Sequence, residues 1–162
     1  MRRMLVLDDE PAVLAALRRS LRAAFPDQPV EIESFDDPEA ALLRAGEQDF
    51  DVVISDYRMP GLNGADVLQM MKGLQPRAVR IVLSASTASA DILDSVNRAE
   101  VFRFLSKPWK HDELVATVRS AFARRATLDA AEGQSCALLA LEREEPGITL
   151  VDRDEHGNVR LY

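Results

Sequence analysis

The sequence alternates between short apolar runs and segments with helical spacing, and this alternation constrains the fold more than any other feature. Five runs are typical of strands: residues 4–7, 30–35, 51–55, 80–84 and 101–106. A segment with helical periodicity follows each of them: residues 11–24, 38–45, 64–73, 88–98 and 111–125. Strict alternation is typical of a parallel sheet whose crossover helices cover both faces. The sequence therefore predicts an α/β fold built on a doubly wound, five-stranded parallel sheet.

The composition excludes several classes of function. The chain has 162 residues and a net charge of −7, so it is poorly suited to binding nucleic acid through its phosphates, and we expect no nucleic-acid partner. Its one cysteine, Cys136, cannot form an internal disulfide or a CxxC metal site. No apolar stretch approaches the ~20 residues that span a bilayer, and the N-terminal run is too short for a signal peptide. We expect a cytoplasmic protein with no membrane partner.

Chemically active side chains follow or end four of the five predicted strands. Asp8 and Asp9 follow the first strand, Asp56 follows the third, Ser84 ends the fourth, and Lys107 follows the fifth. The carboxyl ends of parallel strands meet at one edge of the sheet, and open α/β sheets bind their ligands there. We therefore expect these carboxylates, the hydroxyl and the ammonium group to share one crevice.

Several carboxylates in one crevice favour a bound cation, because they repel one another without it. Oxygen ligands suit Mg²⁺. Zinc is disfavoured, because the sequence has no His or Cys residues at the spacing of zinc ligands. A carboxylate such as Asp56 beside Mg²⁺ can attack a phosphoryl group and form an acyl phosphate. Lys107 and Ser84 would then supply positive charge and a donor to the phosphoryl oxygens. Each residue alone is also compatible with a solvated loop, a cap or a surface position, so the hypothesis depends on the joint pattern.

These residues lie in motifs that resemble the receiver domain of bacterial two-component response regulators. The motifs are LVLDDEP, DVVISDYRMPGLNG, VLSAS and FLSKPW, and the resemblance covers about residues 3–125. It implies a flavodoxin-like sheet with strand order 2-1-3-4-5 and a receiver domain over residues 1–126. It also implies that a sensor histidine kinase or a phosphotransfer protein phosphorylates Asp56. The protein would then be a signalling switch, and its only catalysis would be its own phosphotransfer and dephosphorylation.

The resemblance implies a metal site and a residue that tunes it. Asp8 or Asp9, most directly Asp9, would hold Mg²⁺ together with Asp56. The backbone carbonyl of Arg58 would be a further ligand. The Arg58 side chain occupies a position that is variable in this family and is linked to the lifetime of the acyl phosphate. It would either lengthen that lifetime or be a solvent-facing arginine without such a role.

The resemblance also implies a switch. Ser84 would be the switch hydroxyl, Lys107 the phosphoryl-binding lysine and Phe104 the switch aromatic. Phosphorylation would draw Ser84 toward the phosphoryl group and let Phe104 turn inward, which shifts the population between two forms of a protein-binding surface. Phe104 also fits a simple role in the core. The Lys107-Pro108 peptide bond is cis in this family, which a tertiary amide tolerates at low cost.

Residues 127–162 lie outside the receiver motifs. Ser135 could cap a short helix that ends near Glu144, and the runs 148–152 and 158–162 predict a β-hairpin. An isolated hairpin is barely stable in water, so we expect it to pack on something. It would either brace its own receiver, form a homodimer or dock a downstream protein. The segment is too short for a standard DNA-binding output domain.

Two other classes of function fit parts of the pattern. A phosphatase of the haloacid dehalogenase class also forms an aspartyl phosphate on an α/β sheet. Such an enzyme would have its nucleophile in an Asp-x-Asp motif after the first strand, whereas Asp8 and Asp9 are adjacent and Asp56 follows the third. A receiver-like binding module that is never phosphorylated is the other alternative. Labelling of Asp56 by a small phosphodonor would separate the switch from this module, and steady turnover of a phosphoester would favour the phosphatase.

Overall fold

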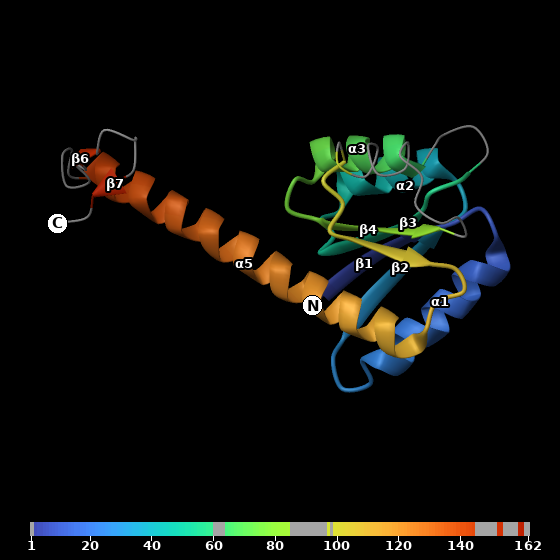
Figure 1. Ribbon diagram of the computed structural model, residues 1–162. Helices are drawn as coiled ribbons and strands as arrows, with labels where there is room; N and C mark the ends of the chain where they lie inside the picture. Colours follow the sequence, from blue (N-terminus) through green and yellow to red (C-terminus); the bar gives the residue numbers. More distant parts are fainter. Residues whose placement is uncertain are drawn as a thin grey trace. The chain divides into compact units, whose positions relative to one another are not determined.

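Five parallel strands form one sheet in the order β2-β1-β3-β4-β5 (Figure 1). The strands are β1 (Arg2–Leu7), β2 (Val30–Phe35), β3 (Val52–Asp56), β4 (Val79–Ser84) and β5 (Arg103–Ser106). This computed structural model describes residues 2–59, 64–84, 97, 99–144, 152–153 and 159–160. The order and the parallel pairing confirm the predicted doubly wound, flavodoxin-like sheet.

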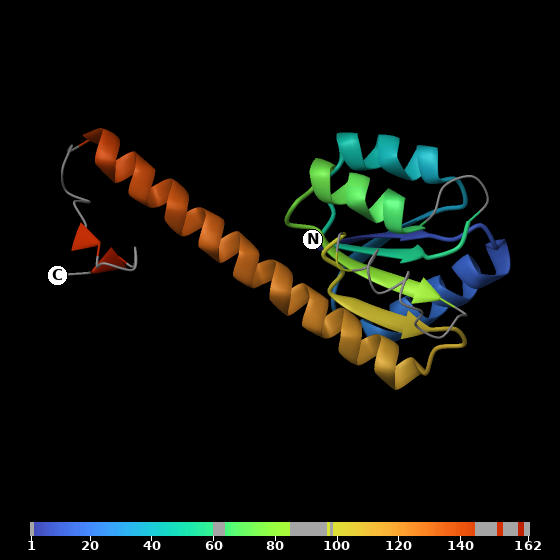
Figure 2. The same cartoon turned by 45° about the horizontal axis from the view of Figure 1, so that its top comes forward.

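Helices cover both faces of this sheet (Figures 1 and 2). They are α1 (Pro11–Ala24), α2 (Pro38–Glu47), α3 (Gly64–Leu74) and α5 (His111–Glu144). The α1 helix and the first turns of α5 pack on one face, and α2 and α3 pack on the other. The helix predicted over residues 88–98 falls almost entirely outside the described residues. None of the helices in the described segments is both long and apolar enough to cross a membrane.

Alternating residues of each central strand fill two separate cores. Met4 and Val6 of β1 pack with Leu17 and Leu21 of α1. Leu5 and Leu7, which point to the opposite face, belong to the second core together with residues of α2 and α3. The strands β3 and β4 are buried along their whole length, as expected for strands with helices on both sides.

Local sequence explains where the first two helices begin. Pro11 and Pro38 occupy the first turn of α1 and α2, where a missing N–H costs nothing. The Asp37 carboxylate accepts a hydrogen bond from the Glu39 N–H at 3.2 Å, so Asp37 is the N-cap of α2, a role for which aspartate is favoured. The Asp37 cap and the proline in the first turn thus together fix the start of α2.

Two buried polar side chains tie the end of α2 and the start of β3 to distant segments. The Gln75 side-chain amide donates to the carbonyls of Ala45 and Gln48, while its oxygen accepts from the Phe50 N–H at 2.8 Å. Arg125 of α5 donates to the Phe50 carbonyl at 2.7 Å and to the Asp49 carboxylate at 2.7 Å. These bonds satisfy backbone groups that no helix or strand partner reaches.

The C-terminal segment differs from its prediction in one respect. Two helices were expected, over residues 111–125 and from Ser135 to Glu144, but a single helix α5 covers His111–Glu144. Residues 126–132 include three alanines and no proline, so nothing interrupts the helix before Gly133, which costs only ~1 kcal/mol in a helix interior. The prediction of a separate helix capped by Ser135 was therefore wrong.

The chain divides into two units, residues 1–126 and 127–162. In the second unit, β6 (Asp152–Arg153) and β7 (Val159–Arg160) form an antiparallel pair. The strand β7 lies within the predicted run 158–162. The strand β6 includes only the last residue of the predicted run 148–152 and continues to Arg153.

Candidate functional site

Side chains from three strand ends meet at the carboxyl edge of the sheet. Asp8 follows β1, Asp56 is the last residue of β3, and Lys107 follows β5. The Lys107 Nζ atom lies 2.7 Å from the Asp8 Oδ2 atom and 3.3 Å from the Asp56 Oδ2 atom. The parallel sheet therefore brings together groups that are up to 99 positions apart in the sequence.

Three carboxylates form an acidic cluster around this lysine. Asp8, Asp9 and Asp56 each offer one oxygen, and these oxygens all lie within 4.8 Å of one another. Asp8 is fully buried and Asp56 is 6% exposed, whereas Asp9 is more exposed than either. The Glu10 N–H donates to the Asp8 Oδ1 atom at 2.9 Å, so Glu10 and Lys107 hold Asp8 from two sides. Such a set of oxygens could hold a hard divalent cation.

The cluster shifts the pKa values of its members in the directions that crowding predicts. Burial, followed by repulsion from Asp8, raises the pKa of Asp56, and Lys107 and a backbone hydrogen bond from Arg58 only partly offset this. Burial opposes the charge on Lys107, but its hydrogen bond to Asp8 and the charges of Asp56 and Asp8 outweigh burial and raise its pKa. The positive charge of Lys107 thus offsets only part of the rise in the pKa of Asp56 that burial and the charge of Asp8 cause.

Ser84 and Phe104 lie on the neighbouring strands β4 and β5. Asp56 pairs with Leu83 in the sheet, so Ser84 is one residue beyond the position opposite the carboxylate. Ser84 is 1% exposed, and its carbonyl accepts a hydrogen bond from the Lys107 N–H at 2.8 Å. Phe104 pairs with Val82 and packs, partly buried, against the core formed with α2 and α3.

The start of α3 lies directly against the end of β3, and Gly64 makes this possible. A Cβ atom on Gly64 would lie 2.0 Å from the Asp56 carbonyl oxygen and 2.7 Å from the Tyr57 Cα atom. The Gly64 N–H also donates to the Tyr57 carbonyl at 2.8 Å. The sequence predicts that this glycine begins the helix over residues 64–73, but it does not reveal the contact with the backbone of Asp56. Glycine commonly marks such a close approach of two backbone segments.

The cis peptide bond and the position of Arg58 are two further expected features of the site. The Lys107-Pro108 peptide bond is cis. The Arg58 side chain is exposed, and among the described residues it forms no ion pair or hydrogen bond. The structure connects Arg58 to Asp56 through the Arg58 backbone N–H. The residues Pro60, Gly61 and Asn63 of the loop after Asp56 lie outside the described residues.

Comparison with known families identifies the class of protein. Residues 4–119 match the family described as the response regulator receiver domain. The chain therefore belongs to the receiver domain family of response regulators in bacterial two-component systems.

Individual relatives agree with this assignment. The chain is 42% identical over 118 residues to the hydrogenase transcriptional regulatory protein HoxA of Cupriavidus necator, covering 73% of this chain and 23% of that protein. It is 36% identical over 121 residues to the transcriptional regulatory protein KdpE of Mycobacterium tuberculosis, covering 75% and 51%. The chain thus spans about a quarter to a half of the length of these two regulators.

Solved structures show the same fold. A signal receiver domain of an HD domain-containing protein from Pseudomonas fluorescens superposes with a TM-score of 0.71 at 25% identity, over 78% of this chain and 98% of that one. An uncharacterized protein from Neptuniibacter caesariensis superposes with a TM-score of 0.69 at 26% identity, over 93% and 97%. The second match extends beyond the residues that the family covers.

Proposed function

We propose that this chain is a phosphorylation-dependent switch in which Asp56 accepts a phosphoryl group from a histidine kinase or a phosphotransfer protein. The receiver domain would comprise residues 1–126, and residues 127–162 would form an extension. The observation that carries the proposal is the cluster in which Lys107 contacts Asp8 and Asp56 at 2.7 and 3.3 Å. An aspartate with an adjacent lysine and two further acids suits a nucleophile that works beside a cation.

The donor set fits Mg²⁺. Asp56 and Asp8 are buried together, and their repulsion helps to raise the pKa of Asp56; a divalent cation would relieve this repulsion. Asp9, Asp8 and Asp56 would hold the ion, with the backbone carbonyl of Arg58 as a further ligand. When bound, Mg²⁺ neutralises negative charge that develops on the phosphoryl oxygens.

The chain's own residues would perform the transfer itself. An Asp56 carboxylate oxygen attacks the phosphorus atom of the phosphohistidine, and the bond between phosphorus and the histidine nitrogen breaks. The nitrogen keeps the electron pair and takes up a proton. Lys107, released from one of its carboxylate contacts, would bind a phosphoryl oxygen through its ammonium group.

The output would follow from the residues beside the site. The Ser84 hydroxyl would bind a phosphoryl oxygen, and Phe104 would move into the space that Ser84 leaves, changing a surface that a downstream protein reads. The acidic net charge of −7 supports protein contact rather than binding of nucleic-acid phosphates by this chain. Residues 127–162 would provide a homodimer contact or a docking element.

Labelling with acetyl phosphate and Mg²⁺ tests the phosphoacceptor. Intact-protein mass spectrometry should show one added phosphoryl group on the unaltered chain and none on Asp56→Asn. Glu47→Gln, which changes an exposed acid at the end of α2, should be labelled normally. Absence of labelling in the unaltered chain would favour a module that is never phosphorylated. Sustained hydrolysis of p-nitrophenyl phosphate that depends on Asp56 would favour a phosphatase instead.

The oligomeric state tests the proposed role of the extension. Light scattering with Mg²⁺, before and after addition of beryllofluoride, should show a dimer in at least one state. A monomer under both conditions would remove the homodimer and leave docking of a separate protein as the role of residues 127–162.

A further inference from the structure

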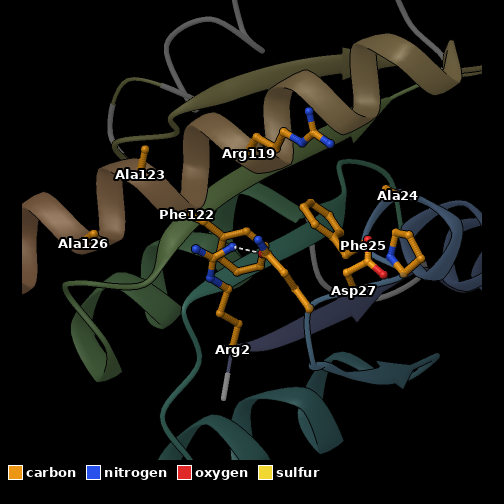
Figure 3. Close-up of a pocket in the computed structure, with 10 residues that line it drawn as sticks. Arg2, Ala24, Phe25, Asp27, Arg119, Phe122, Ala123 and Ala126 are labelled. Atoms are coloured by element: carbon orange, nitrogen blue, oxygen red, sulfur yellow. Dashed lines mark hydrogen bonds between the residues drawn. The ribbon is translucent and has the colours of Figure 1, made fainter.

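A second concave site lies at the edge of the sheet opposite the acidic cluster. The cavity has a volume of about 370 Å³ and is bounded by the start of β1, the end of α1 with the loop that follows, and one side of α5. We call it the α1–α5 pocket; its lining includes Arg2, Phe25, Asp27, Gln28, Arg119 and Phe122. Figure 3 shows these elements around the opening. The volume falls within the ~300–1,000 Å³ range of small-molecule sites.

Aromatic rings form the apolar wall of the α1–α5 pocket. Phe25 and Phe122 meet edge to face, with ring centroids 5.7 Å apart. Both residues are more than nine-tenths buried, so their positions are fixed by the core on which α1 and α5 pack. Because these rings are rigid, they lose little side-chain freedom when a ligand binds. A flat apolar ligand also loses less freedom of its own than a flexible chain does, so the wall favours a flat ligand.

Arginines make the pocket electropositive. The Arg2 guanidinium lies 4.7 Å from the centroid of the Phe122 ring and donates to the Gln28 side-chain oxygen at 2.7 Å (Figure 3). A guanidinium has five N–H donors, so Arg2 keeps donors for a ligand. Arg119 lines the same opening from α5, and within the described part of the chain no carboxylate pairs with it. Asp27 is the one acidic residue of the lining, which leaves the charge positive and favours a monoanion over a dianion.

We propose that the α1–α5 pocket binds a small aromatic monocarboxylate. The ring would pack against the wall of Phe25 and Phe122, and the carboxylate would accept hydrogen bonds from Arg119 and Arg2. Arginine is suited to this task because its planar fork matches the two carboxylate oxygens. The site is independent of phosphorylation at Asp56, because it lies at the amino ends of the strands and the acidic cluster lies at their carboxyl ends.

Sodium benzoate is the probe that tests this site, in Mg²⁺-free buffer at constant ionic strength. Two-dimensional amide NMR should show saturable shifts at Phe25, Gln28, Arg119 and Phe122, with a Kd on the order of 1 mM for so small a ligand. Acetate, which lacks the ring, and benzylamine, which reverses the charge, should each bind at least ~10-fold more weakly. Shifts that do not saturate, or equal binding of benzylamine, would overturn the proposal.

Variants of two arginines on α5 distinguish a specific binding site for benzoate from general attraction of the anion to a basic surface. Arg119→Gln should raise the Kd for benzoate about 10-fold, since a charge-assisted hydrogen bond is lost. Arg124→Gln changes an exposed arginine of the same helix that does not line the pocket, and its Kd should stay within about twofold. Equal weakening by both variants would contradict a built site. Benzoate binding should persist in Asp56→Asn, and Arg119→Gln should still be phosphorylated, so either proposal can fail alone.

Discussion

Lys107 lies closer to Asp8 than to Asp56: its Nζ atom is 2.7 Å from the Asp8 carboxylate and 3.3 Å from the Asp56 carboxylate. The ammonium group that would bind a phosphoryl oxygen is therefore held by a neighbouring acid in the described conformation. Because Asp8 is fully buried, this contact compensates a charge that water cannot reach. Transfer to Asp56 requires Lys107 to exchange carboxylate contacts for the phosphoryl group, and a cation at Asp8 would ease that exchange.

Replacement of Asp56 by asparagine should stabilise the fold in metal-free buffer. Burial and repulsion from Asp8 raise the pKa of Asp56, so the folded state disfavours its ionised form. The expected gain at pH 7 is about 1 kcal/mol, or ~3 °C in Tm for a chain of this size. Thermal denaturation followed by circular dichroism measures the change, with Glu47→Gln, at an exposed position, as the control that should leave Tm nearly unaltered.

The stabilisation by Asp56→Asn should depend on pH with a defined sign. The pKa of Asp56 is higher in the folded than in the unfolded protein, so the folded state binds the proton more tightly. Ionisation costs stability as the pH rises from the ordinary value of 3.8 through the raised folded pKa. The advantage of the variant should be absent below that window and complete above it. An advantage that grows toward low pH would contradict this assignment.

Added Mg²⁺ should stabilise the unaltered protein and should do so much less in Asp9→Asn. An ion that binds only the folded state adds RT ln(1 + [L]/Kd), which is about 1.4 kcal/mol at ten times Kd. Melting curves with increasing MgCl₂, against NaCl of equal ionic strength, give the measurement. An equal gain in both proteins would show that Asp9 is not a ligand.

Alanine at Gly64 should destabilise the protein and disturb the end of β3. Its Cβ atom would collide with the Asp56 carbonyl oxygen and the Tyr57 backbone, and such overpacking costs ~1–3 kcal/mol. Gly73→Ala is a matched control in the same helix, because nothing lies within 4 Å of the added Cβ atom. The control should stabilise α3 by ~0.5–1 kcal/mol. Urea denaturation of both variants measures the contrast, and similar effects of the two would refute the close approach.

Removal of the Arg58 side chain should shorten the life of the acyl phosphate. Arg58 is exposed and follows Asp56 by two positions, where a long cation can shield the phosphoryl group from water. Arg58→Ala should therefore dephosphorylate several-fold faster, and Arg58→Lys should behave nearly as the unaltered protein does. Decay of the phosphorylated form after removal of the phosphodonor gives the rate, and an unchanged rate in Arg58→Ala would remove the idea.

The parallel sheet and the residues at its carboxyl edge could be predicted from local pattern and general rules of topology, whereas the strand order followed only from the resemblance to receiver domains. Apolar runs that end in Asp8, Asp56 and Lys107 are visible in the sequence, and parallel strands place their ends together. The partner of Lys107 could not be predicted, because Asp8 and Asp56 differ by less than 1 Å in their distance from it. The backbone contact of Gly64 was equally hidden, since spacing along the chain does not reveal how closely two segments approach.

The length of α5 was misjudged for a different reason. Serine is one of the residues that commonly cap the start of a helix, so Ser135 favoured the prediction of a short, separate helix. Helix propagation is cooperative, however, and adding residues to an existing helix costs less than starting a new one. The alanines that follow Arg125 therefore extend α5 through Ser135. The sequence also gives no sign that Arg125 is buried and bonded to Phe50 and Asp49.

Gln75 occupies a position that selects for the direction of its hydrogen bonds rather than for size or charge. Its nitrogen faces two carbonyls and its oxygen faces an N–H, so glutamate, which has nearly the same shape, would set acceptor against acceptor. Leucine would fill the space but leave these backbone groups without partners. An amide of this length both donates to the two carbonyls and accepts from the N–H. The junction of α2, β3 and α3 therefore depends on the identity of one residue, Gln75.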